Sequence, residues 1–221
     1  MALLSEKDQQ YLRDEFAQLP RPVKLVMFTQ ERECQYCSET RQIVEELSSL
    51  SDKITAEIVT FDPEGPEAQE YGIDKIPAIV ILADGDEPVD YGIRYFGIPS
   101  GYEFSSLIED IMMVSKGDSG LSEAGKEQLR AISTPVHLQV FVTPTCPYCP
   151  RAVHLAHQMA MENPLIRADM VEAIEFPHLS NKYSVMGVPR TVINEDWHIE
   201  GAAPEPMVLA KVMEAVQAAQ N

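Results

Sequence analysis

The fold is decided by two short stretches, Cys34-Gln35-Tyr36-Cys37 and Cys146-Pro147-Tyr148-Cys149. Together they contain all four cysteines of the 221-residue chain. Each tetrad follows an apolar run typical of a strand and opens a run with helical periodicity. Two cysteines at this spacing bring their sulfurs close enough to close a small disulfide ring and to open it again.

The two tetrads belong to an internal repeat. The same 112 positions separate Cys34 from Cys146 and Cys37 from Cys149. Residues 71–77, which end at Pro77, resemble residues 183–189, which end at Pro189 and are again 112 positions further on. A constant offset between anchors in different parts of each half indicates gene duplication, and we expect two copies of one scaffold.

Hydrophobic periodicity predicts the same order of elements in both halves. In the first half we expect helix, strand, helix, strand, short helix, hairpin and closing helix at residues 5–19, 23–28, 37–50, 54–61, 66–71, 78–82 with 89–96, and 103–114. The second half repeats this order at residues 121–132, 136–142, 150–161, 168–174, 177–183, 191–194 with 197–200, and 207–219. The pattern predicts an α/β fold in which each half has a central mixed sheet flanked by helices.

The boundary between the halves is expected in the small, polar stretch of residues 115–120. It divides the chain into domains at residues 1–117 and 118–221. The first helix has a cap signal, because Ser5 is followed by Asp8 and then by apolar residues at helical spacing, Tyr11, Leu12 and Phe16.

The charge balance limits the classes of partner. There are 35 acidic residues against 17 lysines and arginines, which gives a formal net charge of −18. Such a chain repels phosphate backbones, so we expect no nucleic-acid partner. No apolar run is long enough to span a membrane, and residues 1–8 lack the basic flank and apolar core of a signal peptide. We therefore expect a cytoplasmic location.

A Cys-x-x-Cys pair has three interpretations: half of a zinc site, a structural disulfide or a redox dithiol. One zinc site would need both pairs to converge, although each occupies the same place in its own repeat. A permanent disulfide is hard to reconcile with a cytoplasmic chain, except in hyperthermophiles. The strand-to-helix setting favours redox chemistry, with no metal and no cofactor besides the redox-active disulfides. His154 and His157 are expected to be solvated on a helix face rather than to bind metal.

The start of a helix determines which sulfur reacts. The attacking species is the thiolate, and a free cysteine has a pKa of about 8.5. Unpaired backbone N–H groups and the positive end of the helix dipole stabilise an anion at this position. Cys34 and Cys146 are therefore the predicted nucleophiles, and Cys37 and Cys149, one turn further in, are the predicted resolving thiols. The expected cycle passes through a mixed disulfide with the substrate.

Pro77 and Pro189 are the second element of each predicted site. Each directly precedes an apolar β run, where a proline is accommodated at the first residue of a strand. A simple strand boundary would explain either proline alone, but their repetition at one distance from both tetrads favours a functional role. We expect cis peptide bonds after Ile76 and Val188, and a backbone at both residues that pairs with an extended substrate segment.

The residues between the cysteines should make the two sites unequal. Pro147 rigidifies the second tetrad and removes one N–H group, whereas Gln35 does neither, so the reduction potentials are expected to differ. Tyr36 and Tyr148 are expected to shield the nucleophile and to contact substrate, with simple packing as the alternative.

These residues resemble a known family. The tetrad from Cys146 to Cys149 is typical of glutaredoxins, and a tetrad at a helix start combined with Ile-Pro or Val-Pro before a strand resembles the thioredoxin fold. Two such units in tandem are similar to the glutaredoxin-like protein disulfide oxidoreductases of thermophilic archaea and bacteria. The resemblance covers nearly the whole chain. It implies disulfide reduction, oxidation and isomerisation on protein substrates in the cytoplasm, and recharging by a thioredoxin-reductase-like enzyme.

The sequence departs from thioredoxins in one respect. Thioredoxins carry a buried acid on the strand six residues before the first cysteine, but the residues there are Phe28 and Val140. Glu57 and Asp169 occupy matching positions on the second strand of each half, 112 positions apart. A buried carboxylate with a raised pKa at these positions would take the proton from the resolving thiol. The alternative is that both are surface charges at a strand edge.

The leading hypothesis is a protein dithiol–disulfide oxidoreductase that works by thiol–disulfide exchange at both tetrads. One alternative is a metal- or cluster-binding protein that uses all four cysteines. Another is a peroxiredoxin-reductase module with one active unit, and a third is a chaperone-like binding module. The expected partners are proteins that carry disulfides or dithiols, and no membrane.

Overall fold

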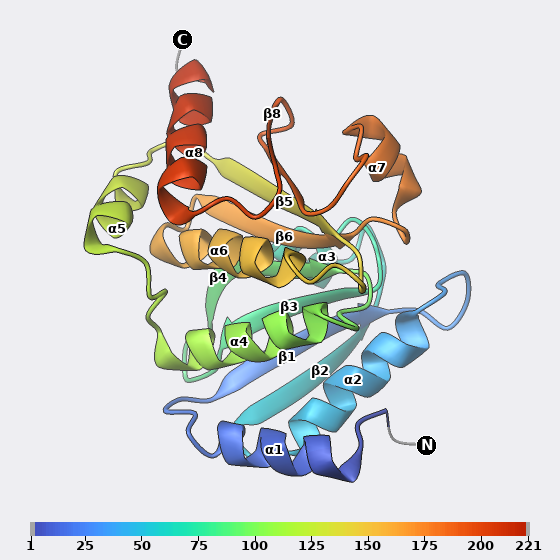
Figure 1. Ribbon diagram of the computed structural model, residues 1–221. Coiled ribbons are helices and arrows are strands. Elements are labelled where there is room, and N and C mark those ends of the chain that lie inside the picture. Colours follow the sequence, from blue (N-terminus) through green and yellow to red (C-terminus); the bar gives the residue numbers. More distant parts are fainter. Residues whose placement is uncertain (1–2, 220–221) are drawn as a thin grey trace. The chain divides into compact units, whose positions relative to one another are not determined.

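The computed structural model describes residues 3–219 and contains the predicted order of elements (Figure 1). Those of the first half are α1 (Glu6–Phe16), β1 (Val23–Thr29), α2 (Cys37–Ser49), β2 (Ile54–Thr60), α3 (Pro66–Tyr71), β3 (Ala78–Ala83), β4 (Val89–Phe96) and α4 (Glu103–Lys116). Those of the second half are α5 (Glu123–Arg130), β5 (Val136–Val142), α6 (Cys149–Glu162), β6 (Ile166–Glu172), α7 (Pro177–Lys182), β7 (Arg190–Ile193), β8 (Trp197–Glu200) and α8 (Glu205–Ala219). The predicted α/β class, with mixed sheets flanked by helices, is confirmed.

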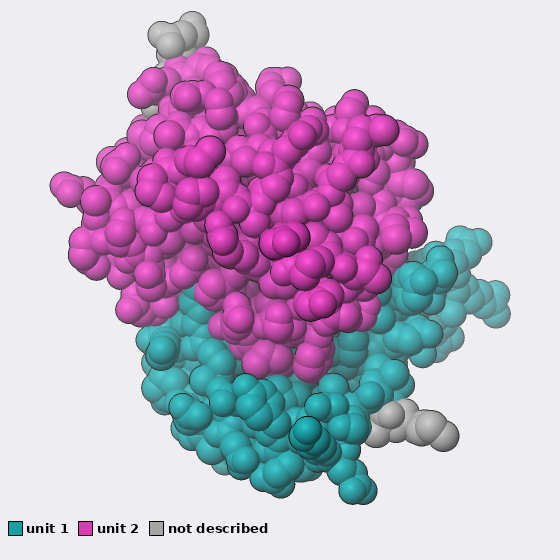
Figure 2. All heavy atoms as spheres, in the orientation of Figure 1, with its two compact units in different colours: residues 1–90, 96–98, 111–117 teal, residues 91–95, 99–110, 118–221 magenta. Residues whose placement is uncertain are grey.

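The described residues form two compact units (Figure 2). The first contains the residues up to Asp90 together with Phe96–Ile98 and Ile111–Gly117. The second contains Tyr91–Tyr95, Pro99–Asp110 and the residues from Asp118 onward. The sequence predicted one division after residue 117, whereas two earlier segments also pack with the second unit. The periodicity of a segment shows that it has an apolar face, but not which neighbour covers that face.

The first unit is built around β1. This strand pairs in parallel with β2 and antiparallel with β3, so the strand order is β2-β1-β3. All six residues of β3 are buried, as are the four from Leu25 to Phe28 in β1. These strands are therefore covered on both faces, as their continuous apolar runs predict.

The second unit is built in the same way around β5, which pairs in parallel with β6 and antiparallel with β7. β8 extends the sheet beyond β7, and the Tyr91–Tyr95 segment of β4 lies on the other side of β6. β2 is thus the outer strand of its ladder, whereas β6 has a neighbour on both sides. This difference determines whether two predicted site residues, Glu57 on β2 and Asp169 on β6, are exposed or buried.

The strand registers refine the repeat. Val23 faces Ile54 in the first unit, and Val136 faces Ile166 in the second. The first strands are therefore related by 113 positions, and the second strands by 112. The segment that leads into Cys146 is one residue shorter than the one that leads into its counterpart.

Several predicted boundaries shift in the structure. β6 begins and ends two residues before the predicted strand of residues 168–174. The Asn163 side chain accepts a hydrogen bond from Leu165 N at 2.9 Å and donates to the carbonyls of Leu129 and Ile132, so the chain turns into the strand early. At the other end, the Glu172 side chain accepts hydrogen bonds from Ile174 N at 3.0 Å and Glu175 N at 2.6 Å, so the chain turns away after the strand.

The predicted cap of the first helix is confirmed, because Ser5 Oγ accepts a hydrogen bond from Asp8 N at 3.2 Å. Leu12 and Phe16 are buried as predicted. Tyr11, however, is 62% exposed, so the prediction that it lies on the buried apolar face of the helix was wrong.

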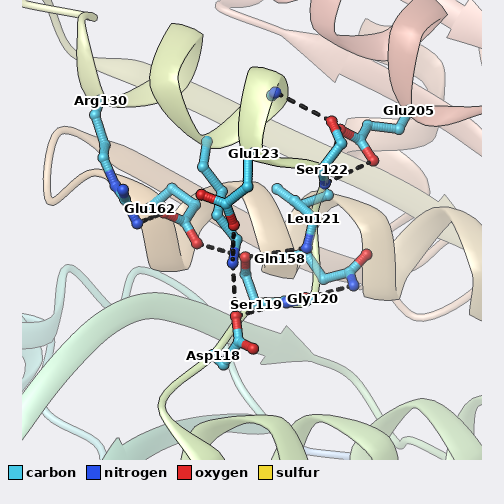
Figure 3. A network of polar contacts seen from close by, with 12 residues as sticks. Asp118, Ser119, Gly120, Leu121, Ser122, Glu123, Arg130, Gln158, Glu162 and Glu205 are labelled. Atoms are coloured by element: carbon cyan, nitrogen blue, oxygen red, sulfur yellow. Dashed lines mark hydrogen bonds and ion pairs between the residues drawn. The ribbon is translucent and has the colours of Figure 1, made fainter.

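The predicted boundary stretch, residues 115–120, is less open than its composition suggests. Ser115 is buried at the end of α4, and its Oγ donates to Arg21 O at 2.5 Å. From Asp118 the chain is held by polar side chains of the second unit (Figure 3). The contacts are those of Ser119 with Glu162 and Gln158, of Ser122 with Glu205, of Lys126 with Asp118, and of Arg130 with Glu162. No helix of the described residues is long and apolar enough to cross a membrane.

Candidate functional site

The C-terminal tetrad forms a disulfide between Cys146 and Cys149, with an S–S distance of 2.17 Å. α6 begins at Cys149, and Tyr148 is its N-cap residue. The backbone N–H of Cys149 donates a hydrogen bond to Cys146 Sγ at 3.1 Å. Cys149 is fully buried, whereas Cys146 keeps 7% of its surface exposed. The outer sulfur is thus the one that receives a helix N–H group, in the arrangement that the helix start predicts.

The N-terminal tetrad forms the corresponding disulfide between Cys34 and Cys37, with an S–S distance of 2.05 Å. α2 begins at Cys37, which is buried, and Cys34 is half-buried in the preceding loop. Glu33, directly before Cys34, has a φ of 58°, in the left-handed region that residues other than glycine seldom occupy. The loop therefore turns sharply just before the outer sulfur.

Each cysteine is bonded to the other cysteine of its own tetrad. The alternative in which all four sulfurs gather round one ion does not fit this pairing. Within residues 3–219, moreover, no group of three or more His, Cys, Asp or Glu side chains is placed to hold a metal ion.

Pro77 and Pro189 lie buried directly before β3 and β7. The peptide bonds that precede them are cis, as predicted. Their carbonyl oxygens accept hydrogen bonds from the glycine that follows each hairpin, Gly97 N at 2.9 Å and Gly201 N at 2.8 Å. Each proline is therefore anchored by equivalent backbone contacts in its own unit.

The predicted substrate-binding residues differ in exposure. Ile76 and Val188, directly before the prolines, are half-buried. Tyr148 is 71% exposed, which is inconsistent with simple packing, whereas Tyr36 is half-buried. Their contacts with substrate stay predictions.

Glu57 is not buried and the pKa of Asp169 is not raised, so neither residue is the acid that the sequence predicted. Glu57 lies on the outer strand β2 with 47% of its side chain exposed, and it forms an ion pair with Lys24 at 2.5 Å. Asp169 is fully buried on the inner strand β6, where it is bound by His137 at 2.6 Å and by Arg167 at 2.8 Å. Burial opposes its ionisation, but these two partners outweigh burial and hold the pKa of Asp169 well below its usual range.

His154 and His157 are not solvated, so this prediction was also wrong. Their Nδ1 atoms lie 2.8 Å and 2.5 Å from the two carboxylate oxygens of Asp110 on α4. Tyr95 donates a further hydrogen bond to Asp110 at 2.5 Å, and Asp110 and His157 are fully buried. Burial raises the pKa of Asp110, but His157 and His154 outweigh it and leave the value at about 2. The two histidines thus fasten α6, the helix that begins at Cys149, to α4.

Glu103 is a candidate that sequence reasoning missed, since it was considered only as the first residue of a helix. Its side chain is 1% exposed, and burial raises its pKa to about 7. Ser106 Oγ donates to its Oε2 at 2.7 Å, while the buried Oε1 has no hydrogen-bond partner among residues 3–219. The helix start is placed beside the C-terminal site, because Tyr102 N donates at 3.0 Å to the carbonyl of Pro144, two residues before the first cysteine of that site.

Comparisons with known proteins agree with this geometry. Residues 136–214 match the model of a thioredoxin domain. A protein disulfide oxidoreductase from Aeropyrum pernix is 30% identical, and the match covers 97% of this chain and 94% of that one with a TM-score of 0.89. A mutant of the alkylhydroperoxide reductase AhpF from Enterococcus faecalis is also 30% identical, with 95% and 99% covered and a TM-score of 0.85.

Curated relatives are longer than this chain. NADH dehydrogenase of Bacillus subtilis is 25% identical over 178 residues, which is 80% of this chain and 32% of the relative. An alkyl hydroperoxide reductase component of Pseudomonas putida is 25% identical over 174 residues, 79% of this chain and 31% of the relative. The chain thus spans about a third of the length of the curated relatives that it matches.

Proposed function

The chain belongs to the glutaredoxin-like family of protein disulfide oxidoreductases, and from this premise we propose how its two disulfides work. It is an enzyme that exchanges dithiols and disulfides with other proteins. The observation that carries the mechanism is the hydrogen bond from Cys149 N to Cys146 Sγ, together with the complete burial of Cys149. An N–H group that points at the outer sulfur stabilises its thiolate, whereas the inner sulfur is kept from solvent.

In the reducing direction, the Cys146 thiolate attacks one sulfur of a substrate disulfide. The substrate S–S bond breaks, its second sulfur leaves as a thiolate, and a mixed disulfide joins Cys146 to the substrate. Cys149 then attacks Cys146, which releases the second substrate thiol and closes the enzyme disulfide. The substrate gains two electrons and the enzyme loses two, and the oxidising direction is the reverse path. Cys34 and Cys37 take the same roles in the first unit.

We assign the remaining site residues to positioning. Pro77 and Pro189 hold the backbone of Ile76 and Val188 at the sheet edge, where an extended substrate segment can pair with it. Tyr148 supplies an exposed aromatic contact for substrate beside the C-terminal disulfide.

Glu103 is the proposed proton acceptor for the resolving thiol of the C-terminal site. A carboxylate with a pKa of about 7 is matched to a thiol that must lose its proton near neutral pH. The Glu103→Gln variant should lower the rate of mixed-disulfide resolution by about 10²-fold and remove the step near pH 7 from its pH profile. If the pH profile of the variant keeps this step, another group accepts the proton from the resolving thiol.

The function is tested by reduction of insulin disulfides with each cysteine changed to serine. Cys149→Ser should trap a covalent complex between Cys146 and the substrate, which non-reducing electrophoresis and mass spectrometry detect. Cys146→Ser should form no such complex at this site. Retained activity with all four cysteines changed to alanine would refute exchange and favour a chaperone-like module.

We further propose that the sites are recharged by a thioredoxin-reductase-like enzyme in the cytoplasm, where thiols are kept reduced. The redox-active disulfides suffice for this, so no bound cofactor is needed. Insulin reduction with dithiothreitol as the sole electron source tests whether a cofactor is needed. The same assay with purified reductase candidates tests the partner. If dithiothreitol supports exchange only after a cofactor is added, the cofactor-free mechanism is wrong.

The similarity to AhpF and to other alkyl hydroperoxide reductase components favours a second candidate function, the reduction of a peroxiredoxin. In this case one disulfide passes electrons to the peroxiredoxin disulfide by the same exchange. Rates with a peroxiredoxin and with insulin, measured on the same preparation, separate the two candidates. A rate with the peroxiredoxin at least about 10²-fold higher than with insulin would favour peroxiredoxin reduction, provided that changing the cysteines of one tetrad abolishes it.

A further inference from the structure

Three large apolar side chains of the second unit are exposed in loops at the edge of the sheet that carries its disulfide. Tyr148, Ile174 and Met186 have exposed fractions of 71%, 72% and 93%. A single exposed apolar side chain is ordinary on a protein surface, but a group of them around one chemical function suggests an interaction site. We refer to these three side chains as the apolar rim.

The strand ladders bring the apolar rim to one edge of the sheet. β5 and β6 run parallel, so their carboxyl ends meet at the same edge, and β7 runs antiparallel to β5, so its first residue also lies there. Tyr148 belongs to the tetrad that follows β5, Ile174 follows β6 by two residues, and Met186 precedes β7 by four. The rim thus comes from three loops at the edge that carries Cys146.

The first unit has different side chains in the same places. The offset of 112 positions that relates the cysteine pairs relates the apolar rim to Tyr36, Asp62 and Asp74. Asp62 is exposed, and 74% of the Asp74 side chain is exposed although it forms an ion pair with Lys75 at 2.6 Å. Two of the three apolar positions are therefore acidic around the N-terminal disulfide.

The segments that lead into the two disulfides differ in the same sense. The exposed residues Glu31, Arg32 and Glu33 precede Cys34. The uncharged residues 143–145, Thr-Pro-Thr, precede Cys146. The N-terminal sulfurs are thus approached through charged side chains, and the C-terminal sulfurs through neutral and apolar ones.

The position of the apolar rim determines what it contacts. Exchange requires a substrate cysteine to come within bonding distance of Cys146, so the residues that flank this cysteine come to lie on the rim. Apolar flanking side chains are favoured there because the contact removes them from water. Methionine can adapt to flanking residues of different shapes, and tyrosine offers a large apolar ring. Such segments are buried in folded proteins and exposed in unfolded ones.

We propose that the C-terminal disulfide acts preferentially on cysteines flanked by apolar residues, as exposed in unfolded or misfolded polypeptide, and that the N-terminal disulfide lacks this preference. The inference rests on the proposed oxidoreductase function and specifies the substrate class of one of its two sites. The electrons follow the exchange described above, with a dithiol reductant to recharge the site.

The test uses the full chain with Cys34→Ser and Cys37→Ser, so that only the C-terminal disulfide reacts. The pre-reduced protein is mixed in single turnover with two oxidised peptides that differ only in their flanking residues, Leu and Phe in one and Ser and Gly in the other. Hydroxyethyl disulfide serves as a small, neutral reference. We expect the second-order rate constant to be about tenfold higher for the apolar peptide.

Changing the rim to the residues of the first unit, Ile174→Asp with Met186→Asp, should remove this tenfold preference and leave the reference rate unchanged. The conservative pair Ile174→Val and Met186→Leu should keep the preference, and so should Met207→Asp, a change at an exposed residue of α8. Equal rates for both peptides, with normal reduction of the reference, would refute the substrate preference proposed for the apolar rim and would not contradict the oxidoreductase function. Failure to reduce the reference would overturn the function itself.

Discussion

Asp110→Asn tests whether the buried contacts between α4 and α6 hold the C-terminal site in place. The carboxylate of Asp110 is fully buried and lies within 2.8 Å of both His154 and His157, and it accepts a further hydrogen bond from Tyr95. An amide in its place loses the charge and offers one oxygen instead of two. At least one of the two histidine N–H groups then loses its acceptor.

The expected cost can be worked from the contacts. The shift of the Asp110 pKa from 3.8 to about 2 corresponds to about 2 kcal/mol. Removing one partner of a buried, hydrogen-bonded charge pair costs about 3–5 kcal/mol. We therefore expect a loss of about 3 kcal/mol, which for a chain of this size lowers the Tm by about 6–12 °C.

The pH dependence of this loss has a definite sign. The lowered pKa of Asp110 contributes stability above its unfolded value near 4, and this is lost as the pH falls through about 2. His154 is affected first by burial, which lowers its pKa, but Asp110 outweighs burial and raises it. Its contribution is complete below pH of about 6.5 and is lost as the pH rises through the raised value. The gap between wild type and variant should be widest between about pH 4 and 6.5.

Differential scanning calorimetry from pH 4 to 8 measures this gap. Glu109→Gln is the matched control, because Glu109 is the neighbouring, exposed residue of α4 and its substitution should change stability by less than about 0.5 kcal/mol. If Asp110→Asn costs no more than the control, the contacts do not support α6 as argued.

Three further predictions concern other parts of the chain. Cys146→Ser and Cys34→Ser should lower insulin reduction unequally, by at least about threefold, since an N–H group contacts Cys146 Sγ and Pro147 stiffens that loop; equal losses would contradict unequal sites. Asp169→Asn should cost about 3 kcal/mol in urea unfolding at pH 7 and less at pH 3, because the contribution of the lowered pKa begins to be lost below the unfolded value of about 4 and disappears only below the folded value; an equal cost at both pH values would show that the ion pairs are not its source. Ser5→Ala should lower the free energy of unfolding by about 1 kcal/mol in thermal unfolding, and Ser5→Thr should lower it much less. Equal stability of Ser5→Ala and wild type would show that the cap does not stabilise the helix.

Local patterns were enough to predict the elements and the sites they carry. The repeat of tetrad and proline at one offset predicted both disulfide loops and the cis peptide bonds before Pro77 and Pro189. The helix starts were also predictable, because the signals for Ser5 and for the tetrads lie within one turn of the helix they begin.

Burial of individual acids was not predictable, because it depends on neighbours far away in the sequence. Glu57 and Asp169 occupy matching strand positions, yet β2 is an outer strand and β6 is flanked on both sides. Whether a strand is inner or outer is decided by the Tyr91–Tyr95 segment, which packs with the second unit. His154 was misjudged for the same reason, since its partner Asp110 is 44 residues away in the sequence.

The assignment of nucleophile and resolving thiol is tested most directly by rapid alkylation of the reduced protein. Brief exposure to iodoacetamide near pH 6.5, followed by mass spectrometry, reports which sulfur carries the thiolate. The mechanism predicts that Cys34 and Cys146 are modified first, while the buried Cys37 and Cys149 react more slowly by about tenfold or more. Equal modification within each tetrad, or faster reaction of the inner cysteines, would contradict it.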